Sequence, residues 1–266
     1  MPITLLKIRT PLPRWLVPVL GAIPIVLLLA LWAGATRGPA EERAISPTIL
    51  PSPQEVIRSV PELFRRDLVN HTLASLKRIG LGYVLALAAA IPLGILMGSL
   101  TVFRASFSPL TTAAGYIPIA TLVPLTLSWF GTGELQKTIF LAMAFGIYLL
   151  PLVIAAIDKV SDVYVKTAYT LGTSNLRIIL YVLIPISLPD IWSAMRLAFG
   201  VGWTYLVLTE VIVMESGLGY LVQISFRRGP REHIYLVILL ITLIAWVADI
   251  LWDRLGKRMF RYRGVA

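Results

Sequence analysis

Long stretches without a charged residue constrain this 266-residue chain more than any other feature. Four of them cover residues 15–36, 79–103, 105–133 and 138–157. Each is long enough for a helix to cross a bilayer, which needs roughly 20 predominantly apolar residues. Only 14% of all residues are charged, whereas soluble domains carry about 25%. The sequence therefore predicts an all-α integral membrane protein and excludes a large domain outside the membrane.

Two further apolar segments bring the number of predicted transmembrane helices to six. The fifth helix begins after Pro185 and Pro189 and runs to about Met214, and the sixth covers residues 234–252. The third stretch, residues 105–133, contains three prolines but no polar hairpin, so we expect one kinked or unwound span. Irregular backbone at membrane depth is tolerated where it lines a cavity.

Charged segments divide the chain. We expect an N-terminal tail (1–14), a first span (15–36), an external loop with an interfacial helix (37–78), a five-helix core (79–253) and a basic tail (254–266). An even number of spans places both tails on one side, and their Lys and Arg residues place that side in the cytoplasm of a bacterial inner membrane. A cleaved signal peptide is the alternative for the first span, but the length of the apolar run favours a retained helix.

Residues 158–181 interrupt the apolar core with a polar segment of helical pattern. The beginning of this segment is too charged to enter the membrane, and the segment is too long for an ordinary hairpin between spans. On the predicted topology it lies in the cytoplasm. We therefore expect this insert to have a function of its own.

The chain lacks the residue patterns of an enzyme. It has no cysteine and only two histidines, His71 and His233, both at predicted membrane boundaries. No H-E-x-x-H, G-x-S-x-G or G-x-x-x-x-G-K-[ST] motif is present, so we expect no catalytic residue, metal site or ATP hydrolysis on this chain. The chain has a net charge of +10. Its Lys and Arg residues lie beside the spans, which indicates contact with anionic lipid rather than nucleic acid. These features favour transport or conduction driven from elsewhere.

The second half of the insert resembles the E-A-A-x-x-x-G-x9-I-x-L-P loop of permease subunits in bacterial ABC importers. Gly172 and Pro185 match at the motif's spacing and Ala168 matches its second alanine, whereas Lys166 and Thr167 replace the glutamate and the first alanine. Ala168 and Gly172 are small and four residues apart, so we expect a knob on one helix face that seats in a partner's groove. The resemblance implies contact with an ATPase subunit through Lys166, Thr167, Ala168, Leu171, Gly172 and Pro185.

Other motifs extend the resemblance over roughly residues 48–258. They look like those of nitrate, taurine, alkanesulfonate and bicarbonate-type permeases, and thiamine-precursor permeases are similar over the same stretch. The resemblance implies a six-helix, type I importer-like permease without a cofactor of its own. Its implied partners are a second copy of the chain, two ATPase subunits that hold ATP and Mg²⁺, and an external binding protein. The motifs are Leu50-Pro51-Ser52-Pro53, His71 with Ser75, Leu76 and Arg78, Pro124 with Trp129-Phe130-Gly131, Arg196, and Glu210 with Gly217-Leu218-Gly219-Tyr220.

Glu210 lies in an otherwise apolar run, where an unpaired charge costs on the order of 2.5–3.5 kcal/mol. It is either a gate or pathway residue or a structural carboxylate that caps the turn at residues 217–220 or pairs with Arg227 or Arg228. Neutral hydrogen-bonding groups suit a passing anion, although core packing is the alternative for each. The pathway or gate candidates are Thr121, Thr126, Ser128, Trp129, Trp203 and Glu210.

Arg196 and Asp190 lie near the cytoplasmic end of the fifth span, where we expect them to form an ion pair. Two other functions are open alternatives. A secondary carrier or channel would need coupling carboxylates in repeated halves, and the sequence shows neither. A scaffold protein would need neither the broken span nor the loop motif.

Overall fold

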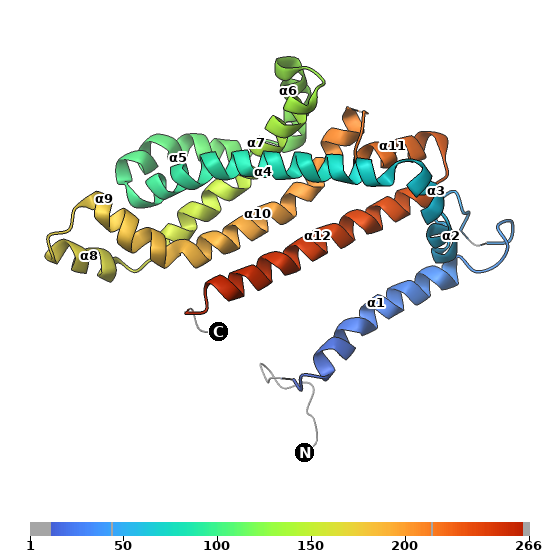
Figure 1. The fold of residues 1–266 in the computed structure, drawn as a ribbon, viewed down its shortest axis with the longest axis horizontal. Helices are drawn as coiled ribbons and strands as arrows, with labels where there is room; N and C mark the ends of the chain where they lie inside the picture. Colours follow the sequence, from blue (N-terminus) through green and yellow to red (C-terminus); the bar gives the residue numbers. More distant parts are fainter. Residues whose placement is uncertain (1–11, 44, 214, 263–266) are drawn as a thin grey trace.

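The computed structural model describes residues 12–43, 45–213 and 215–262, and all regular secondary structure within these ranges is helical (Figure 1). Most of the predicted N-terminal tail, Met214 at the predicted end of the fifth span and the last four residues lie outside the described part. The α-helices are α1 (Leu16–Ala35), α2 (Pro53–Arg58), α3 (Val60–Arg65), α4 (Leu68–Ser99), α5 (Thr101–Gly115), α6 (Leu122–Phe130), α7 (Glu134–Asp158), α8 (Asp162–Thr170), α9 (Asn175–Ile178), α10 (Ile184–Ile212), α11 (Leu218–Arg228) and α12 (Glu232–Met259).

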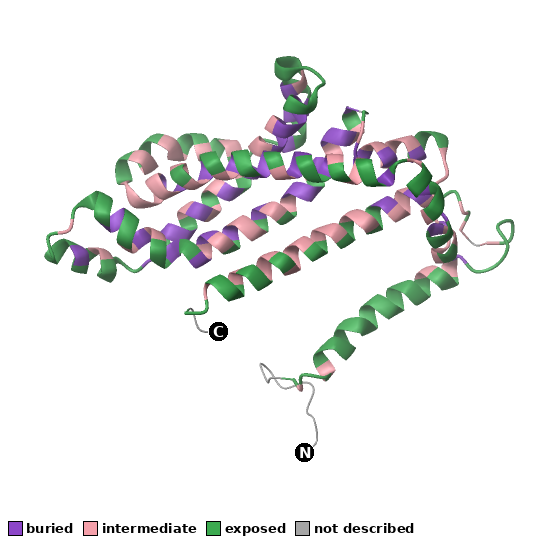
Figure 2. Cartoon of the chain, viewed as in Figure 1, coloured by how far each residue is buried: buried purple, intermediate pink, exposed green. Residues whose placement is uncertain are grey.

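Three long helices, α4, α7 and α10, form the centre of the bundle (Figure 1). Their facing sides carry most of the buried residues, whereas α12 is mainly half-buried or exposed (Figure 2). Helix α1 buries none of its described residues and stands apart from the bundle. The α11 end of the bundle is the end where α4, α7 and α12 begin, and the α8 end is the opposite one. Apolar helices with exposed outer faces are typical of a protein surrounded by lipid.

Among the described residues, five helices are long and apolar enough to cross a membrane. Helices α5 and α6 make a sixth span if they are taken together, and they meet at a bend of 87°. The short 3₁₀ turn at Ile119–Thr121 directly follows this bend and leads into α6. The predicted break in the third span is therefore present, and it is a sharp turn rather than a mild kink.

Several predicted helix boundaries are wrong. Helix α4 begins at Leu68, before the predicted start at Ile79. The fifth span does not begin after its prolines, because α9, a π-helical turn and α10 form one helical path over residues 175–212 that contains Pro185 and Pro189. The π-helical turn at Ile179–Leu183 pairs each N–H with a carbonyl five residues back instead of four. It lies just before Pro185, which has no backbone N–H to donate. Helix α12 continues past the predicted end at residue 252.

The predicted interfacial helix of the 37–78 loop is two short helices, α2 and α3. Ser52 caps α2 in a capping box with Glu55, whose carboxylate also accepts hydrogen bonds from Arg43 at 3.0 and 2.8 Å. The Arg43 guanidinium lowers the pKa of Glu55 to about 2. The loop is tied to α1 as well, because the Trp32 indole N–H donates to the Pro51 carbonyl at 2.8 Å.

Glycines of α4 allow close contact with α7, as the sequence predicts for a pair of helices in lipid. A Cβ at Gly82 would lie 2.6 Å from the Cβ of Leu141, and one at Gly98 would lie 2.6 Å from that of Ile157. Gly94 is equally crowded by Val153. Gly80, which we also expected to pack, has nothing within 4 Å of its Cβ position.

The pair Gly82 and Gly80 offers a matched test of this packing. Gly82→Leu should destabilise the protein by about 1–3 kcal/mol, because the side chain overpacks the contact between α4 and α7. Gly80→Leu brings the same gain in helix propensity without a clash, so it should not lower the stability of the protein. Thermal unfolding in detergent measures the stability of both variants, once each has been shown to elute as a monodisperse peak. Equal shifts for the two variants would contradict the close contact.

Candidate functional site

Charged side chains are buried together at the α11 end of the bundle. Arg78 of α4 is 2% exposed, and Lys137 of α7 and Glu210 of α10 are fully buried. Charges at such positions must be paired and hydrogen-bonded. We call this group the α11-end cluster; its members are Ser75, Arg78, Glu134, Lys137, Glu210, Glu215 and Ser216.

Glu210 is the centre of this cluster, and its two carboxylate oxygens accept several hydrogen bonds. The Ser75 hydroxyl donates to them at 2.7 and 2.9 Å, the Arg78 guanidinium at 2.7 Å and the Gly219 backbone N–H at 2.9 Å. Gly217 has a φ of +113°, and a Cβ there would lie 2.3 Å from the Glu210 carboxyl carbon. Only glycine therefore lets the turn before α11 close over this carboxylate.

Arg78 connects α4 to three other segments. Its Nε donates to Glu134 of α7 at 2.6 Å, and its terminal nitrogens donate to the Ser216 carbonyl at 2.8 Å and hydroxyl at 2.5 Å. Lys137 lies 3.2 Å from Glu215 and 3.4 Å from Glu134. The two cations of the cluster thus face three carboxylates, and no positive charge is left unpaired within it.

The structure favours the structural interpretation of Glu210. The carboxylate caps the turn at residues 217–220, which is one of the two alternatives that the sequence left open. The alternative in which Glu210 pairs with Arg227 or Arg228 is wrong. Both of these side chains are exposed at the far end of α11, and Arg78 pairs with Glu210 instead. A role of Glu210 as a gate stays a prediction.

Sequence reasoning missed Arg78 as a buried ion-pair partner. It treated Arg78 as the edge of the second span, although the helix begins ten residues earlier. A signal was available, since Ser75, Arg78 and Gly82 recur at i, i+3 and i+7 and share one helix face. All three are buried against other helices. An arginine aligned with small residues in this way indicates a buried partner.

A second ion-pair group lies between the middle of α10 and the second half of α12. Arg196 of α10 donates to both oxygens of Asp249 at 2.5 and 2.6 Å and to Asp253 at 2.7 Å. The expected pair between Arg196 and Asp190 is wrong, because the Arg196 guanidinium contacts Asp249 and Asp253 of α12 instead. Asp190 lies 3.5 Å from Lys159. The group ties α10 to α12.

The insert contains α8 and α9, joined by a turn at Gly172. The Gly172 N–H donates to the Tyr169 carbonyl at 2.9 Å and the Thr173 N–H donates to the Ala168 carbonyl at 3.1 Å, which is a Schellman motif. Gly172 has a φ of +74°, as that motif requires. The expected knob of Ala168 and Gly172 is wrong, because Ala168 is buried in the core cluster that also contains Ile178 and Gly172 follows the helix end.

Large apolar side chains are exposed on this insert. Leu171, at the turn, is 78% exposed, and Lys166, Thr167 and Pro185 are exposed as well. Exposed apolar groups in a polar surface mark contacts with another protein. The exposed apolar residues of the insert are Val163, Tyr164, Tyr169, Leu171, Leu176, Leu180 and Tyr181.

The remaining pathway candidates do not come together in one place. The Thr126 hydroxyl is buried between α6 and α7, where it accepts a hydrogen bond from Gln136 at 2.8 Å. Trp203 is 5% exposed and packs in the core. Thr121, Ser128 and Trp129 are exposed around α6. The structure therefore does not join these residues into a single binding surface.

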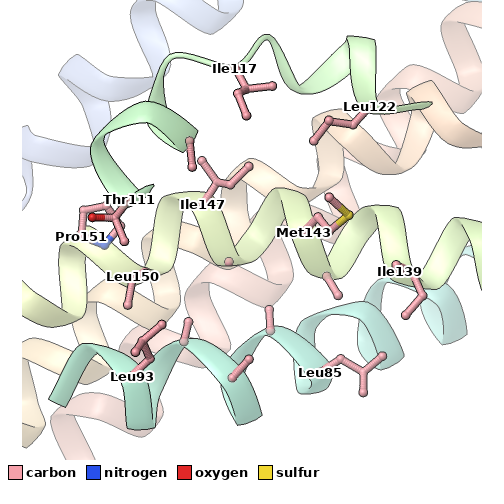
Figure 3. Close-up of a pocket in the computed structure, with 16 residues that line it drawn as sticks. Leu85, Leu93, Thr111, Ile117, Leu122, Ile139, Met143, Ile147, Leu150 and Pro151 are labelled. Atoms are coloured by element: carbon pink, nitrogen blue, oxygen red, sulfur yellow. The ribbon is translucent and has the colours of Figure 1, made fainter. Parts of the chain in front are cut away.

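A cavity of about 510 Å³ lies between α4, α5 and α7 (Figure 3). Its walls are made by side chains such as Leu85, Leu93, Met143 and Ile147, and Thr111 provides the one hydroxyl group. The Thr111 hydroxyl already donates to the Ser108 carbonyl at 3.1 Å. This cavity therefore has little to offer a charged solute.

A bundle of long apolar helices with an exposed polar insert between its spans is the architecture of a multi-pass membrane protein. Residues 90–261 match the family of the binding-protein-dependent transport system inner membrane component. The chain belongs to this family of ABC importer permeases, and its fold is that of the type I members.

Two relatives match over nearly the whole chain. The taurine transport system permease protein TauC of Escherichia coli is 31% identical over 97% of this chain and 94% of its own length. The riboflavin transport system permease protein RibX of Chloroflexus aurantiacus is 30% identical over 98% and 97%, respectively. A chain of the inward-facing MetNI methionine ABC transporter has a TM-score of 0.64 at 17% identity, covering 72% of this chain and 95% of that chain. This last similarity supports the fold alone.

Replacement of Glu210 tests the α11-end cluster. Glu210→Ala should destabilise the protein by about 3–5 kcal/mol, because it removes one partner of a buried ion pair and the cap of Gly219. Glu62→Ala is the matched control; it lies outside the cluster and its side chain is 50% exposed and pairs with Arg66, so its loss should cost about 0–1 kcal/mol. Denaturant titration of the purified protein measures both. A stability of Glu210→Ala equal to that of the control would contradict the structural role.

Proposed function

We propose that this chain is the permease subunit of an ATP-driven importer in a bacterial inner membrane. As a homodimer it forms the pathway for a small anionic solute of the nitrate, sulfonate/taurine or bicarbonate class, which an external binding protein delivers. The observation that carries the proposal is the family match over residues 90–261 together with a taurine permease relative over 97% of the chain. ATP and Mg²⁺ are held by two separate ATPase subunits.

The charge distribution supports an orientation with the α8 end in the cytoplasm. The end of α12 and the insert lie at this end of the bundle (Figure 1). Arg254, Lys257 and Arg258 lie in the last turns of α12 and Arg261 follows the helix, and basic residues beside a span stay on the cytoplasmic side. In this orientation both termini are cytoplasmic, and the α11-end cluster faces the binding protein.

The exposed insert is the part of the chain that contacts the ATPase. Its turn is rigid, because the Schellman motif fixes the backbone at Gly172, and Leu171 projects from it. Closure of the two ATPase subunits draws the two inserts of the dimer together and rocks the bundles, so that the pathway opens outward and then inward. Lys166 and Thr167, which replace the family's glutamate and alanine, lie exposed on α8 and form part of this contact.

A second candidate solute is an organic heterocycle of the thiamine-precursor kind. The observation that favours it is the riboflavin permease relative, which matches 98% of the chain. The permease mechanism would be the same. The two candidates differ in whether the transported molecule carries a small oxyanion group, which an uptake experiment resolves.

Purification of the tagged chain from its native membrane tests the function. We expect a stoichiometric ATPase with a Walker motif to co-purify, and vesicles of the complex to take up labelled taurine, nitrate or bicarbonate only with ATP and the binding protein. Uptake of riboflavin instead of these anions would favour the second candidate. A chain that purifies without an ATPase even after gentle solubilisation would contradict the importer and revive the secondary carrier.

Leu171 provides a test of the contact with the ATPase. Leu171→Ser should lower the amount of co-purified ATPase and the uptake rate at least about fivefold, because an exposed apolar anchor at an interface contributes more than about 1 kcal/mol. The matched control is Val102→Ser, an equally exposed apolar residue at the α8 end but outside the insert. Both variants should unfold like the wild type. Unchanged ATPase binding by Leu171→Ser would contradict the assignment of the insert.

A further inference from the structure

We propose that Tyr148 of α7 and Tyr205 of α10 form a binding station for the oxygens of the transported anion inside the membrane. The proposal rests on the function proposed above and names the residues that the solute contacts on its way through this subunit. It concerns a pair of hydroxyl groups that lie outside both ion-pair groups.

The two phenol oxygens lie 3.1 Å apart and form a hydrogen bond with each other. The two rings are stacked, with centroids 6.1 Å apart. They line a cavity of about 470 Å³, whose other walls include Gly115, Ile117 and Pro118. The cavity therefore brings two hydroxyl groups to the break between α5 and α6.

The two hydroxyl groups lie within the membrane-spanning part of the bundle, where a surface that faces lipid is unfavourable for them. Tyr148 is 14 residues from the start of α7, which corresponds to about 21 Å along the helix axis. Tyr205 lies seven residues before the end of α10. A hydroxyl exposed to hydrocarbon has no partner beyond its neighbour and is costly to place there. Yet Tyr148 is 41% exposed in the single chain, so this face borders water or a second copy.

The broken span supports the same conclusion independently. The residues between α5 and the 3₁₀ turn are not helical, and one of them is Pro118, which has no N–H. At membrane depth, non-helical backbone is tolerated only where protein covers it or where it lines a water-filled cavity. Here it forms a wall of the cavity with the two tyrosines. Both observations place the pathway at this face.

The chemistry of the pair suits a sulfonate, nitrate or bicarbonate ion. In the hydrogen-bonded pair one hydroxyl donates to the other, so the proton of the second hydroxyl is still available for donation. When an anion arrives, both O–H groups can turn and donate to two of its oxygens. No carboxylate lines the described cavity, so nothing there repels an anion. Neutral donors bind the anion more weakly than a charged site would, so the ion can leave again.

The other polar places in the bundle are less suitable for this role. The larger cavity shares Ile117, Ile147 and Pro151 with this one, but its one hydroxyl is engaged by the backbone. The cations of the α11-end cluster already contact carboxylates. The tyrosine pair thus combines available donors with an open cavity inside the spans.

The test uses the complex of permease, ATPase and binding protein in vesicles, with labelled taurine as the first probe and nitrate and bicarbonate as the second and third. The double variant Tyr148→Phe/Tyr205→Phe keeps both rings and removes both hydroxyls. We expect uptake by this variant to fall about tenfold or more, as for loss of a hydrogen bond to a charged group. ATPase activity stimulated by the binding protein should persist, because the insert is unchanged.

The matched control is Tyr83→Phe. The Tyr83 hydroxyl also lies among the spans, but it donates to the Met195 carbonyl at 2.9 Å and does not line the cavity. Uptake per assembled complex should match the wild type in this variant. The control separates loss of an anion contact from the general effect of removing a hydroxyl from the bundle.

Two results would overturn the station while leaving the importer intact. The first is wild-type uptake by the double phenylalanine variant, which would show that the rings only pack. The second is parallel loss of uptake and of stimulated ATPase activity, which would show a role in coupling rather than in solute contact. Absence of ATP-driven uptake of all three anions by the wild-type complex would overturn the proposed anion function itself, and the station with it.

Discussion

The buried ion pair of Arg78 and Glu210 is the interaction on which the arrangement of the spans depends. Removing two charges from water costs several kcal/mol per ion, and mutual attraction offsets this only when every remaining donor and acceptor is satisfied. Here Ser75, Gly219 and Glu134 complete the set. The pair therefore permits one alignment of α4 with α10 and closes the turn before α11 in the same step.

Helix α10 is held by two arginine contacts. Arg78 reaches it at the α11 end, and its own Arg196, near the middle of the helix, binds two carboxylates of α12. Between these points α10 meets α7 through close apolar contacts, and a Cβ at Gly202 would lie 2.0 Å from the Phe145 ring. A helix tied at two points and tightly packed between them moves with its neighbours. This construction suits a bundle that rocks as one body.

The spans could be predicted from the sequence because uncharged length depends on the bilayer alone. The same rule failed at Arg78, since it treats each charged residue as a helix end, whereas this charge is neutralised by a residue 132 positions away. The separate rule that a proline ends a helix failed at Pro185, where a local π-turn accommodates the proline. Pairing between helices and backbone adjustment are properties of the packed bundle. The insert was predicted from its polar, helical pattern and its motif, but the burial of Ala168 was not, because it depends on a core cluster assembled from several helices.

The distribution of polar groups suggests how such a bundle can pass an anion without retaining it. Arg78 and Lys137, the buried cations of the described spans, each contact carboxylates. An unpaired cation in the pathway would bind an anion strongly in a medium of low dielectric constant and slow its release. Hydroxyl groups provide weaker, reversible contacts. On the proposed function, locking the charges into the structure while leaving Tyr148 and Tyr205 at an open cavity separates stability from conduction.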